Sequence, residues 1–234
     1  MSRPDKKRYI IAASKSWNIE AARSFIADSP DLQIKLITDK KALTYGEIKN
    51  FNPRYVFFLH WSWLIPQAIH RNYDCVVFHM TDLPFGRGGS PLQNLIERGI
   101  YKTKIAAIKA VRELDAGDIL LKKSLTLEGS ADEIFRRATK IIFTSMIPRI
   151  IKDEPVPVPQ KGKVVRFKRR LPEQGTIARL SSLTKVYDYI RMLDAEGYPP
   201  AFMEVSGLRL EFFDAQKKKD YITAKVRLRI KDET

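Results

Sequence analysis

The sequence predicts an α/β fold, in which a mostly parallel sheet with helices on both faces is followed by a small α+β module. Three observations predict it. Short, nearly continuous apolar runs recur through the first half of the 234 residues, and segments with helical spacing separate them. Runs of this kind are typical of parallel strands that are buried on both faces. A stretch of alternating prolines, residues 155–159, then divides this part from the remainder.

The first half begins with a βα unit. Residues 8–13 form an apolar run that ends in a polar loop, and Ile19, Ala22 and Phe25 then recur at helical spacing. Three further runs predict strands and two segments predict short helices: strands at 32–37, 55–59 and 75–78, and helices at 45–50 and 66–71. Right-handed crossovers bring the carboxyl ends of such strands to one edge of the sheet, where ligands bind in open α/β folds.

The second half starts with a turn-rich stretch, residues 82–91. The elements predicted after it are helices at 92–98, 131–151 and 182–194 and strands at 104–111, 119–124, 209–213 and 223–230. Ser130 and Glu133 form a capping box at the start of the long helix. Strictly alternating proline excludes helix and ladder pairing, so residues 154–163 are predicted to be an extended linker between a domain at 1–153 and a small domain at 164–234.

Composition restricts the class of protein. With 44% hydrophobic residues the chain can bury a core, and its single cysteine, Cys75, excludes an internal disulfide. No apolar stretch approaches the roughly 20 residues of a membrane helix, and the N-terminus lacks a signal region, so a cytoplasmic protein that binds neither membrane nor metal is expected. The net charge of +15, concentrated at 161–170 and 217–219, attracts nucleic acids, nucleotides and polyglutamates alike, or forms only a solvated surface.

His79 and Asp115 are the residues that best suit proton chemistry. His79 follows an apolar strand and precedes a glycine-rich turn, and imidazole exchanges protons near neutral pH. Asp115 lies in a tight turn after another strand, where its carboxylate could approach the imidazole. Each residue also has a structural interpretation, as a strand-end histidine and as a turn residue that bonds its own backbone.

A string of motifs with His79 at its head resembles the folate-dependent formyltransferase family. After His79 it comprises Leu83-Pro84, Arg87-Gly88, Pro91, Thr103 and the run Leu114-Asp115-Ala116-Gly117-Asp118-Ile119. The likeness covers roughly residues 8–150, and three C-terminal segments are similar to the small domain of the tRNA and sugar branches: 169–173, 189–193 and 198–202. The resemblance implies a Rossmann-like formyltransferase domain that transfers a formyl group from 10-formyltetrahydrofolate to a primary amine.

The family likeness also implies roles for individual residues. His79 would stabilise the oxyanion and pass a proton to the leaving nitrogen, while Asp115 would orient His79 and help to accept the amine proton. The family's catalytic Asn falls at Val77, which cannot donate a hydrogen bond. His60 is the first candidate to replace that donor, and Gln93 and Asn94 are others.

Ligand contacts are expected in two further groups. The pterin of the folate would lie against Trp63, Leu64, Ile65, Val111 and Leu114, and the acceptor against Ser14, Lys15, Arg87 and Gln93. The tRNA branch of the family carries a fuller C-terminal domain and an insertion near the crevice. The short C-terminal module here, with no extra segment between Ile11 and Leu32 or between Ile37 and Tyr55, therefore favours a UDP-linked 4-amino-4,6-dideoxy sugar of the pseudaminic acid type over tRNA. A methionyl-tRNA formyltransferase and a non-catalytic folate-binding relative are the alternatives, and a homodimer through the C-terminal module remains open.

Overall fold

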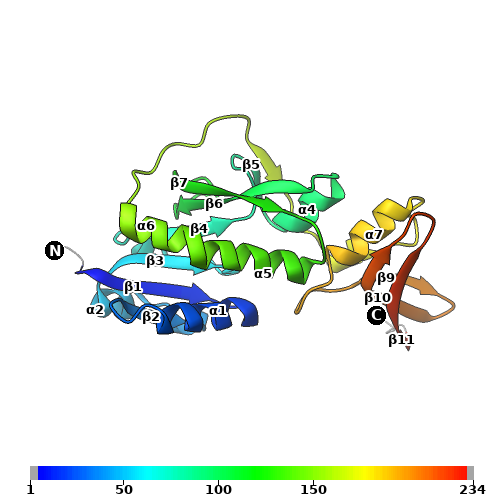
Figure 1. Ribbon diagram of the computed structural model, residues 1–234, viewed down its shortest axis with the longest axis horizontal. Helices are drawn as coiled ribbons and strands as arrows, with labels where there is room; N and C mark the ends of the chain where they lie inside the picture. Colours follow the sequence, from blue (N-terminus) through cyan, green and yellow to red (C-terminus); the bar gives the residue numbers. More distant parts are fainter. Residues whose placement is uncertain (1–4, 231–234) are drawn as a thin grey trace. The chain divides into compact units, whose positions relative to one another are not determined.

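The computed structural model describes residues 5–230. Its main sheet has six strands in the order β2-β1-β3-β4-β6-β7, and the first four run parallel. The bounds of these strands are β1 (Asp5–Ala13), β2 (Gln33–Ile37), β3 (Pro53–Leu59), β4 (Cys75–His79), β6 (Lys102–Lys109) and β7 (Ile119–Thr126). β6 pairs antiparallel with β4, which makes the sheet mixed at this side (Figure 1). The α/β class and the mostly parallel sheet predicted from the apolar runs are confirmed.

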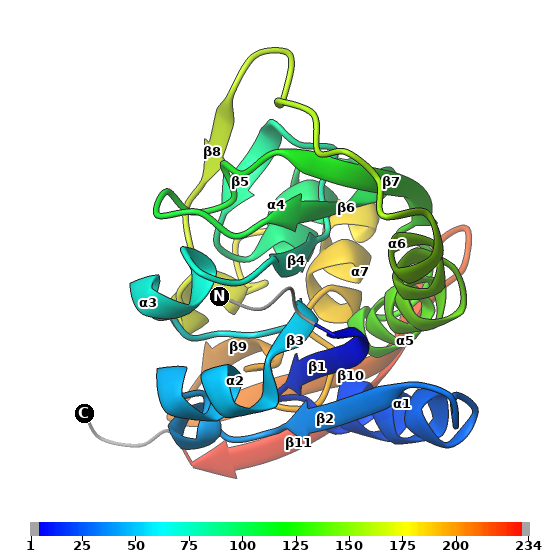
Figure 2. The same ribbon diagram turned by 90° about the vertical axis from the view of Figure 1, so that its left-hand side faces the viewer.

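Helices cover both faces of this sheet, as the view along it shows (Figure 2). α1 (Ser16–Ala27) and α6 (Ile147–Asp153) lie on one face, and α2 (Tyr45–Phe51) and α3 (Gln67–His70) lie on the other. The strands between them are fully buried in their centres, with Ile10 and Phe57 completely shielded from solvent. This double burial explains why the strands read as continuous apolar runs.

The long helix predicted at 131–151 is interrupted. α5 (Ala131–Ile141) passes into a π-helical turn (η2, Ile142–Met146) before α6 begins. Pro148 has no N–H to donate to the preceding turn and its ring crowds the carbonyl four residues earlier, which accounts for the wider turn just before it. The capping box at its start is confirmed, because Ser130 N donates to Glu133 Oε2 and Glu133 N donates to Ser130 Oγ.

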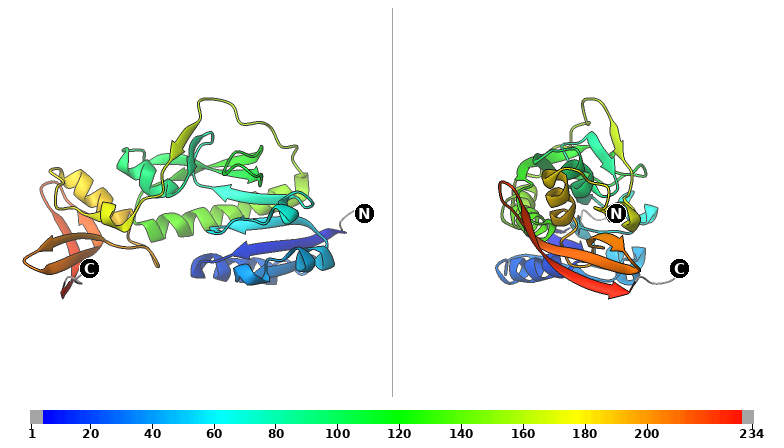
Figure 3. Two further views of the ribbon diagram at one scale, coloured as in Figure 1. Left: turned by 180° about the vertical axis from the view of Figure 1, so that it is seen from behind. Right: turned by 90° about the vertical axis from the view of Figure 1, so that its right-hand side faces the viewer.

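The C-terminal part forms a separate three-stranded antiparallel sheet with α7 (Leu183–Arg191) beside it (Figure 3). Its strands are β9 (Ala201–Val205), β10 (Leu208–Lys217) and β11 (Ile222–Ile230). The elements that sequence patterns did not predict are β9, the paired short strands β5 (Phe85–Gly88) and β8 (Val165–Phe167), and the 3₁₀ helices η1 (Lys40–Ala42) and η3 (Pro172–Gly175). β5, β8, η1 and η3 have only three or four residues each, which is too few for a periodic pattern. α4 (Pro91–Glu97) was predicted.

The chain folds into two compact units that alternate along the sequence. The first unit contains residues up to Arg87, Lys104–Leu125 and Arg136–Arg166, and the second contains the remainder. Domain limits at 153 and 164 remain a prediction. Among the described residues, no helix is long and apolar enough to cross a membrane, and no group of three or more His, Cys, Asp or Glu side chains is placed to hold a metal ion.

The proline-rich linker makes one ladder contact that the sequence argument excluded. Val158 and Ile119 form an antiparallel bridge, in which each backbone N–H donates to the other's carbonyl at 2.9 and 2.8 Å. The prediction that this segment forms no ladder contact was wrong, because the alternation leaves every second residue with a free N–H.

Candidate active site

The imidazole of His79 is held by a different partner at each ring nitrogen. His79 is the last residue of β4, and its side chain is 8% exposed. Nε2 lies 2.7 Å from the carbonyl oxygen of Gly86, and Nδ1 lies 3.5 Å from Oδ1 of Asp115. Because a carbonyl only accepts, Nε2 carries the proton of that bond. Nδ1 is therefore the nitrogen that faces the carboxylate.

The Gly86 carbonyl also accepts a hydrogen bond from Thr81 Oγ1 at 3.3 Å. Thr81 is completely buried, and Gly86 has a φ of 82°, a conformation that glycine adopts without strain. These constraints fix the acceptor that orients the ring. The glycine-rich turn after β4 therefore supplies the carbonyl that binds His79.

Asp115 reaches His79 from the connection between β6 and β7. Its side chain is 8% exposed and its backbone is left-handed, with φ 54°. Non-glycine residues adopt this conformation uncommonly, although Asp is among those that tolerate it best. Two residues later, an added Cβ at Gly117 would meet the Lys109 carbonyl oxygen at 1.8 Å, so glycine is required there. The turn is thus shaped by two local backbone constraints.

Val77 lies two residues before His79 on the same face of β4. It packs against two buried clusters, one around Ile10 and Val56 and one around Leu83. Its position is therefore explained by apolar packing, and its side chain has no hydrogen-bond donor.

His60 begins the loop after β3 with a left-handed backbone, φ 48°. Its carbonyl accepts a hydrogen bond from Ser14 Oγ at 2.9 Å, which ties the carboxyl ends of β1 and β3 together, and its ring meets the edge of Trp17. Burial, with a smaller contribution from the nearby charge of Lys15, lowers the pKa of His60 to about 4. His60 is therefore neutral near pH 7, and a neutral imidazole has one N–H to donate.

The loops expected to hold the pterin expose large apolar side chains. Leu64 and Leu114 are 90% and 59% exposed, and Trp63 and Val111 are also largely exposed. The bases of both loops pack on the buried cluster around Ile10, through Trp61 and Ile65 on one side and Ala110 on the other. Exposed apolar groups that gather in this way mark ligand or partner sites. Side chains of this kind can pack against the face of a planar ring.

The remaining predicted contact residues are engaged with protein groups. Lys15 lies over the Trp17 ring, with Nζ 5.8 Å from its centroid, and Arg87 donates to Gln160. Gln93 belongs to the second unit, where it is 2% exposed and donates to the Met192 carbonyl. The structure therefore brings His79 and Asp115 together, and it places Gln93 in a buried packing position.

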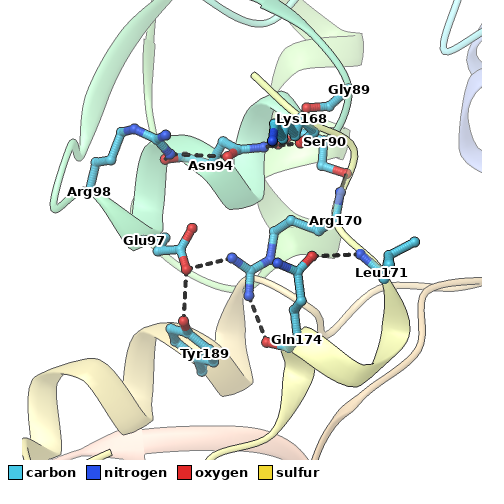
Figure 4. Close-up of polar contacts among 10 residues, drawn as sticks. All are labelled: Gly89, Ser90, Asn94, Glu97, Arg98, Lys168, Arg170, Leu171, Gln174 and Tyr189. Atoms are coloured by element: carbon cyan, nitrogen blue, oxygen red, sulfur yellow. Dashed lines mark hydrogen bonds and ion pairs between the residues drawn. The ribbon is translucent and has the colours of Figure 1, made fainter. Parts of the chain in front are cut away.

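Asn94 and Arg170 form hydrogen bonds and an ion pair within the second unit (Figure 4). The Asn94 amide nitrogen donates to three carbonyl oxygens, those of Gly89, Ser90 and Lys168, at 2.9 to 3.1 Å. Arg170 forms an ion pair with Glu97, which also accepts from the Tyr189 hydroxyl. These bonds leave Asn94 no spare donor hydrogen, and they give part of the basic run at 161–170 a structural use.

Gln160 is a residue near the site that the sequence analysis missed. Its Nε2 donates to the carbonyls of Asp115 and Gly117, both at 2.8 Å. It lies in the predicted linker, 45 residues from Asp115. A glutamine after a proline-rich run carries no local signal, because its importance depends on a contact between distant segments.

Comparison with known proteins gives consistent results. Residues 172–229 match the family model described as "Methionyl-tRNA formyltransferase, C-terminal domain". A solved structure named "Methionyl-tRNA formyltransferase from Clostridium thermocellum" is 53% identical, with a TM-score of 0.94, and the match covers 96% of this chain and 99% of that one. A curated methionyl-tRNA formyltransferase of Rickettsia prowazekii is 28% identical over 73% of this chain, which spans 59% of that protein's length.

A third relative shares the fold at lower identity. A structure described as a likely sugar N-formyltransferase from Mycobacterium tuberculosis is 16% identical, with a TM-score of 0.73, and the match covers 92% of this chain and 99% of that one.

Proposed function

This chain belongs to the formyltransferase family, and on that premise we propose that it transfers a formyl group from 10-formyltetrahydrofolate to the amine of methionyl-tRNA. The observation that carries the proposal is the 53% identity over nearly the whole chain to a protein named methionyl-tRNA formyltransferase. The His79–Asp115 pair supports a proton-transfer role at the expected position.

The expected sugar-nucleotide acceptor was wrong. Sugar N-formyltransferases share only the fold, at 16% identity for the mycobacterial structure, whereas the clostridial relative at 53% carries the methionyl-tRNA name. The sequence argument relied on the shortness of the C-terminal module. That argument fails because the match covers 99% of the clostridial chain, so a chain of this length does not separate the two acceptors.

The chain spans about three fifths of the length of the curated relatives it matches. Recognition of tRNA by this chain is therefore part of the proposal. The net charge of +15 supports a polyanionic acceptor, because phosphate contacts supply most of the affinity for nucleic acids.

The donor would bind between the loops that expose Trp63, Leu64, Val111 and Leu114. Their apolar side chains would cover the pterin face, which removes their surface from water at a gain of about 25 cal/mol per Å². Bound there, 10-formyltetrahydrofolate would supply the formyl group, whose bond to N10 breaks as the acceptor nitrogen bonds to the formyl carbon.

His79 and Asp115 would manage the protons of this exchange. The acceptor nitrogen loses a proton and the leaving nitrogen gains one, so no net proton is consumed. Asp115, whose carboxylate lies 3.5 Å from Nδ1 of His79, would accept the first proton. His79 would donate the second from Nδ1, the ring nitrogen on the Asp115 side, because Nε2 donates to the Gly86 carbonyl. A positioned acid or base contributes about 10²- to 10⁴-fold in rate.

The oxyanion donor differs from the family pattern because Val77 offers no hydrogen. His60 is the candidate we favour, since burial keeps its ring neutral near pH 7 and a neutral imidazole carries one N–H. Asn94 is ruled out as a donor in this conformation by its three carbonyl acceptors.

The first test is a formylation assay with mass detection of the product. Purified protein is incubated with 10-formyltetrahydrofolate and methionyl-tRNA, and we expect a gain of one formyl group on the methionyl amine. His79→Ala should reduce kcat by at least about 10²-fold, because it removes the positioned acid. Arg23→Ala is the control, since Arg23 is an exposed residue of α1.

Two outcomes would contradict the proposal. Equal rates in the wild type and His79→Ala would remove His79 from the chemistry. Folate binding without transfer to methionyl-tRNA would favour the non-catalytic relative, in which Val77 marks the lost donor.

A further inference from the structure

The side chain of Gln160 connects the two groups that hold His79. Its Nε2 donates to the carbonyls of Asp115 and Gly117, and its Oε1 accepts from Nε and Nη2 of Arg87 at 3.1 and 2.9 Å. A carboxamide has two donor hydrogens and two acceptor lone pairs, and all four are used here.

The turn on one side of Gln160 needs such support. Asp115 is left-handed and Gly117 packs directly against the Lys109 carbonyl. Within the turn, Ala116 N reaches the Glu113 carbonyl only at 3.3 Å. Backbone in sparsely populated conformations persists only where surrounding contacts determine it. The two 2.8 Å bonds from Gln160 supply contacts of this kind to the turn that carries Asp115.

Arg87, on the other side, is itself fixed. Its side chain is 11% exposed, and Nη1 lies 3.5 Å from Oε1 of Glu113. Arg87 directly follows Gly86, whose carbonyl binds Nε2 of His79. Gln160 therefore links the segment that contacts Nε2 to the turn that contacts Nδ1.

We propose that Gln160 is a positioning residue for the His79–Asp115 pair. Its carboxamide sets the separation between the Gly86 carbonyl and the Asp115 carboxylate, and this separation orients the imidazole between them. The kinetic consequence rests on the proposed function, whereas the effect on the ring of His79 does not. A displacement of about 1 Å at a reacting group costs on the order of 10²-fold in rate.

Two variants and a control test this role. Gln160→Leu removes all four hydrogen bonds, while Gln160→Glu keeps the acceptor for Arg87 but turns carboxylate oxygen toward the carbonyls of Asp115 and Gly117. Gln33→Leu is the matched control, because Gln33 Oε1 also accepts from an arginine, Arg8 Nε at 3.0 Å, on the exposed edge strand β2.

Three measurements are made on the full chain: thermal unfolding, kcat and KM for formyl transfer, and the ¹⁵N chemical shifts of the imidazoles. The chain has three histidines, so the resonances of His79 are identified by its replacement. We expect both Gln160 variants to lower kcat by about 10- to 100-fold with KM unchanged. We also expect both Gln160 variants to move the ¹⁵N shifts of His79 in the same direction as Asp115→Asn does. Gln33→Leu should change neither kcat nor the His79 shifts.

The outcomes separate this proposal from the proposed function. His79 shifts at their wild-type positions in both Gln160 variants would overturn the positioning role, whatever the activity. If the His79 shifts move in the Gln160 variants while the wild type transfers no formyl group, the positioning role is supported and the proposed function is overturned. If Gln160→Leu fails to fold, Gln160→Glu decides, because it retains the arginine contact.

Discussion

Single residues divide the candidate site between a histidine–carboxylate pair, His79 and Asp115, and the buried neutral ring of His60. His79 is oriented by Gly86 and faces Asp115, whereas burial and the charge of Lys15 hold the pKa of His60 at about 4. The two histidines therefore suit the two proposed tasks: proton exchange beside a carboxylate for His79, and donation of a hydrogen bond by a neutral ring for His60.

His60→Gly tests this division, because glycine adopts the left-handed backbone found there and has no side-chain donor. The pKa of His60 is lowered in the folded state, so between pH 6.5 and about 4 the unfolded chain binds more protons and the free energy of unfolding falls as the pH is lowered. In the variant, the dependence of the unfolding free energy on pH should be weaker by up to about 1.4 kcal/mol per pH unit over this range, as measured by urea unfolding. Its kcat at pH 7 should fall by about 10²-fold if His60 is the oxyanion donor.

Each readout has its own contradicting result. If the unfolding free energy of the variant depends on pH as it does in the wild type, His60 has the same pKa in the folded and unfolded chain. An unchanged kcat would remove His60 as the oxyanion donor and leave the acid-base roles of His79 and Asp115 untouched.

Elements place the reacting groups through their ends. His79 is the last residue of β4, Asp115 lies in the connection from β6 to β7, and Gln160 lies in the linker. The bridge between Val158 and Ile119 anchors this linker two residues before Gln160. The segment that reads as an extended spacer is therefore a structural part of the first unit.

Gly117→Ala tests how tightly the turn after β6 is constrained. Its Cβ would lie 1.8 Å from the Lys109 carbonyl oxygen, and backbone at that distance must move. We expect a loss of about 1–3 kcal/mol in the free energy of unfolding and a fall in kcat of about 10²-fold, measured by chemical denaturation and the formylation assay.

Gly46→Ala is the matched control, because no atom lies within 4 Å of its added Cβ and the residue is helical in α2. It should stabilise the protein by about 0.5–1 kcal/mol with kcat unchanged. A Gly117→Ala protein as stable and active as the wild type would show that the turn can shift without cost.

At the scale of the whole molecule, charge distinguishes the acceptor from the donor. The excess of 15 positive charges favours a partner with many phosphates. If methionyl-tRNA is the acceptor, its KM should rise by about tenfold or more from about 50 to about 200 mM salt for two or more phosphate contacts. Steady-state kinetics over this range, with folate binding measured in parallel, checks the expectation.

The folate arm is the reference in that experiment, because its contacts are mainly apolar in the proposed site. A KM for methionyl-tRNA that is flat with salt would contradict a tRNA acceptor held by this basic surface. A steep dependence for both ligands would point to a general effect of salt on the fold.

The sequence by itself determined the parallel sheet, most of its helices, and the positions of His79 and Asp115 at the ends of strands. These features depend on local patterns, namely apolar runs, helical spacing and turn residues, which neighbouring residues encode. The interruption before Pro148 was not predicted, because the helical spacing continues through residues 131–151.

Only the tertiary structure decided how those residues meet. Asp115 approaches His79 to 3.5 Å across 36 residues of sequence, and the hydrogen bonds of Gln160 reach residues 45 and 73 positions away. The left-handed backbone of Asp115 lies in the turn that these bonds hold. The length of the chain also did not predict the class of acceptor correctly. The physical reason is that a hydrogen bond between distant segments requires only one residue on each side, so it leaves no periodic pattern in either.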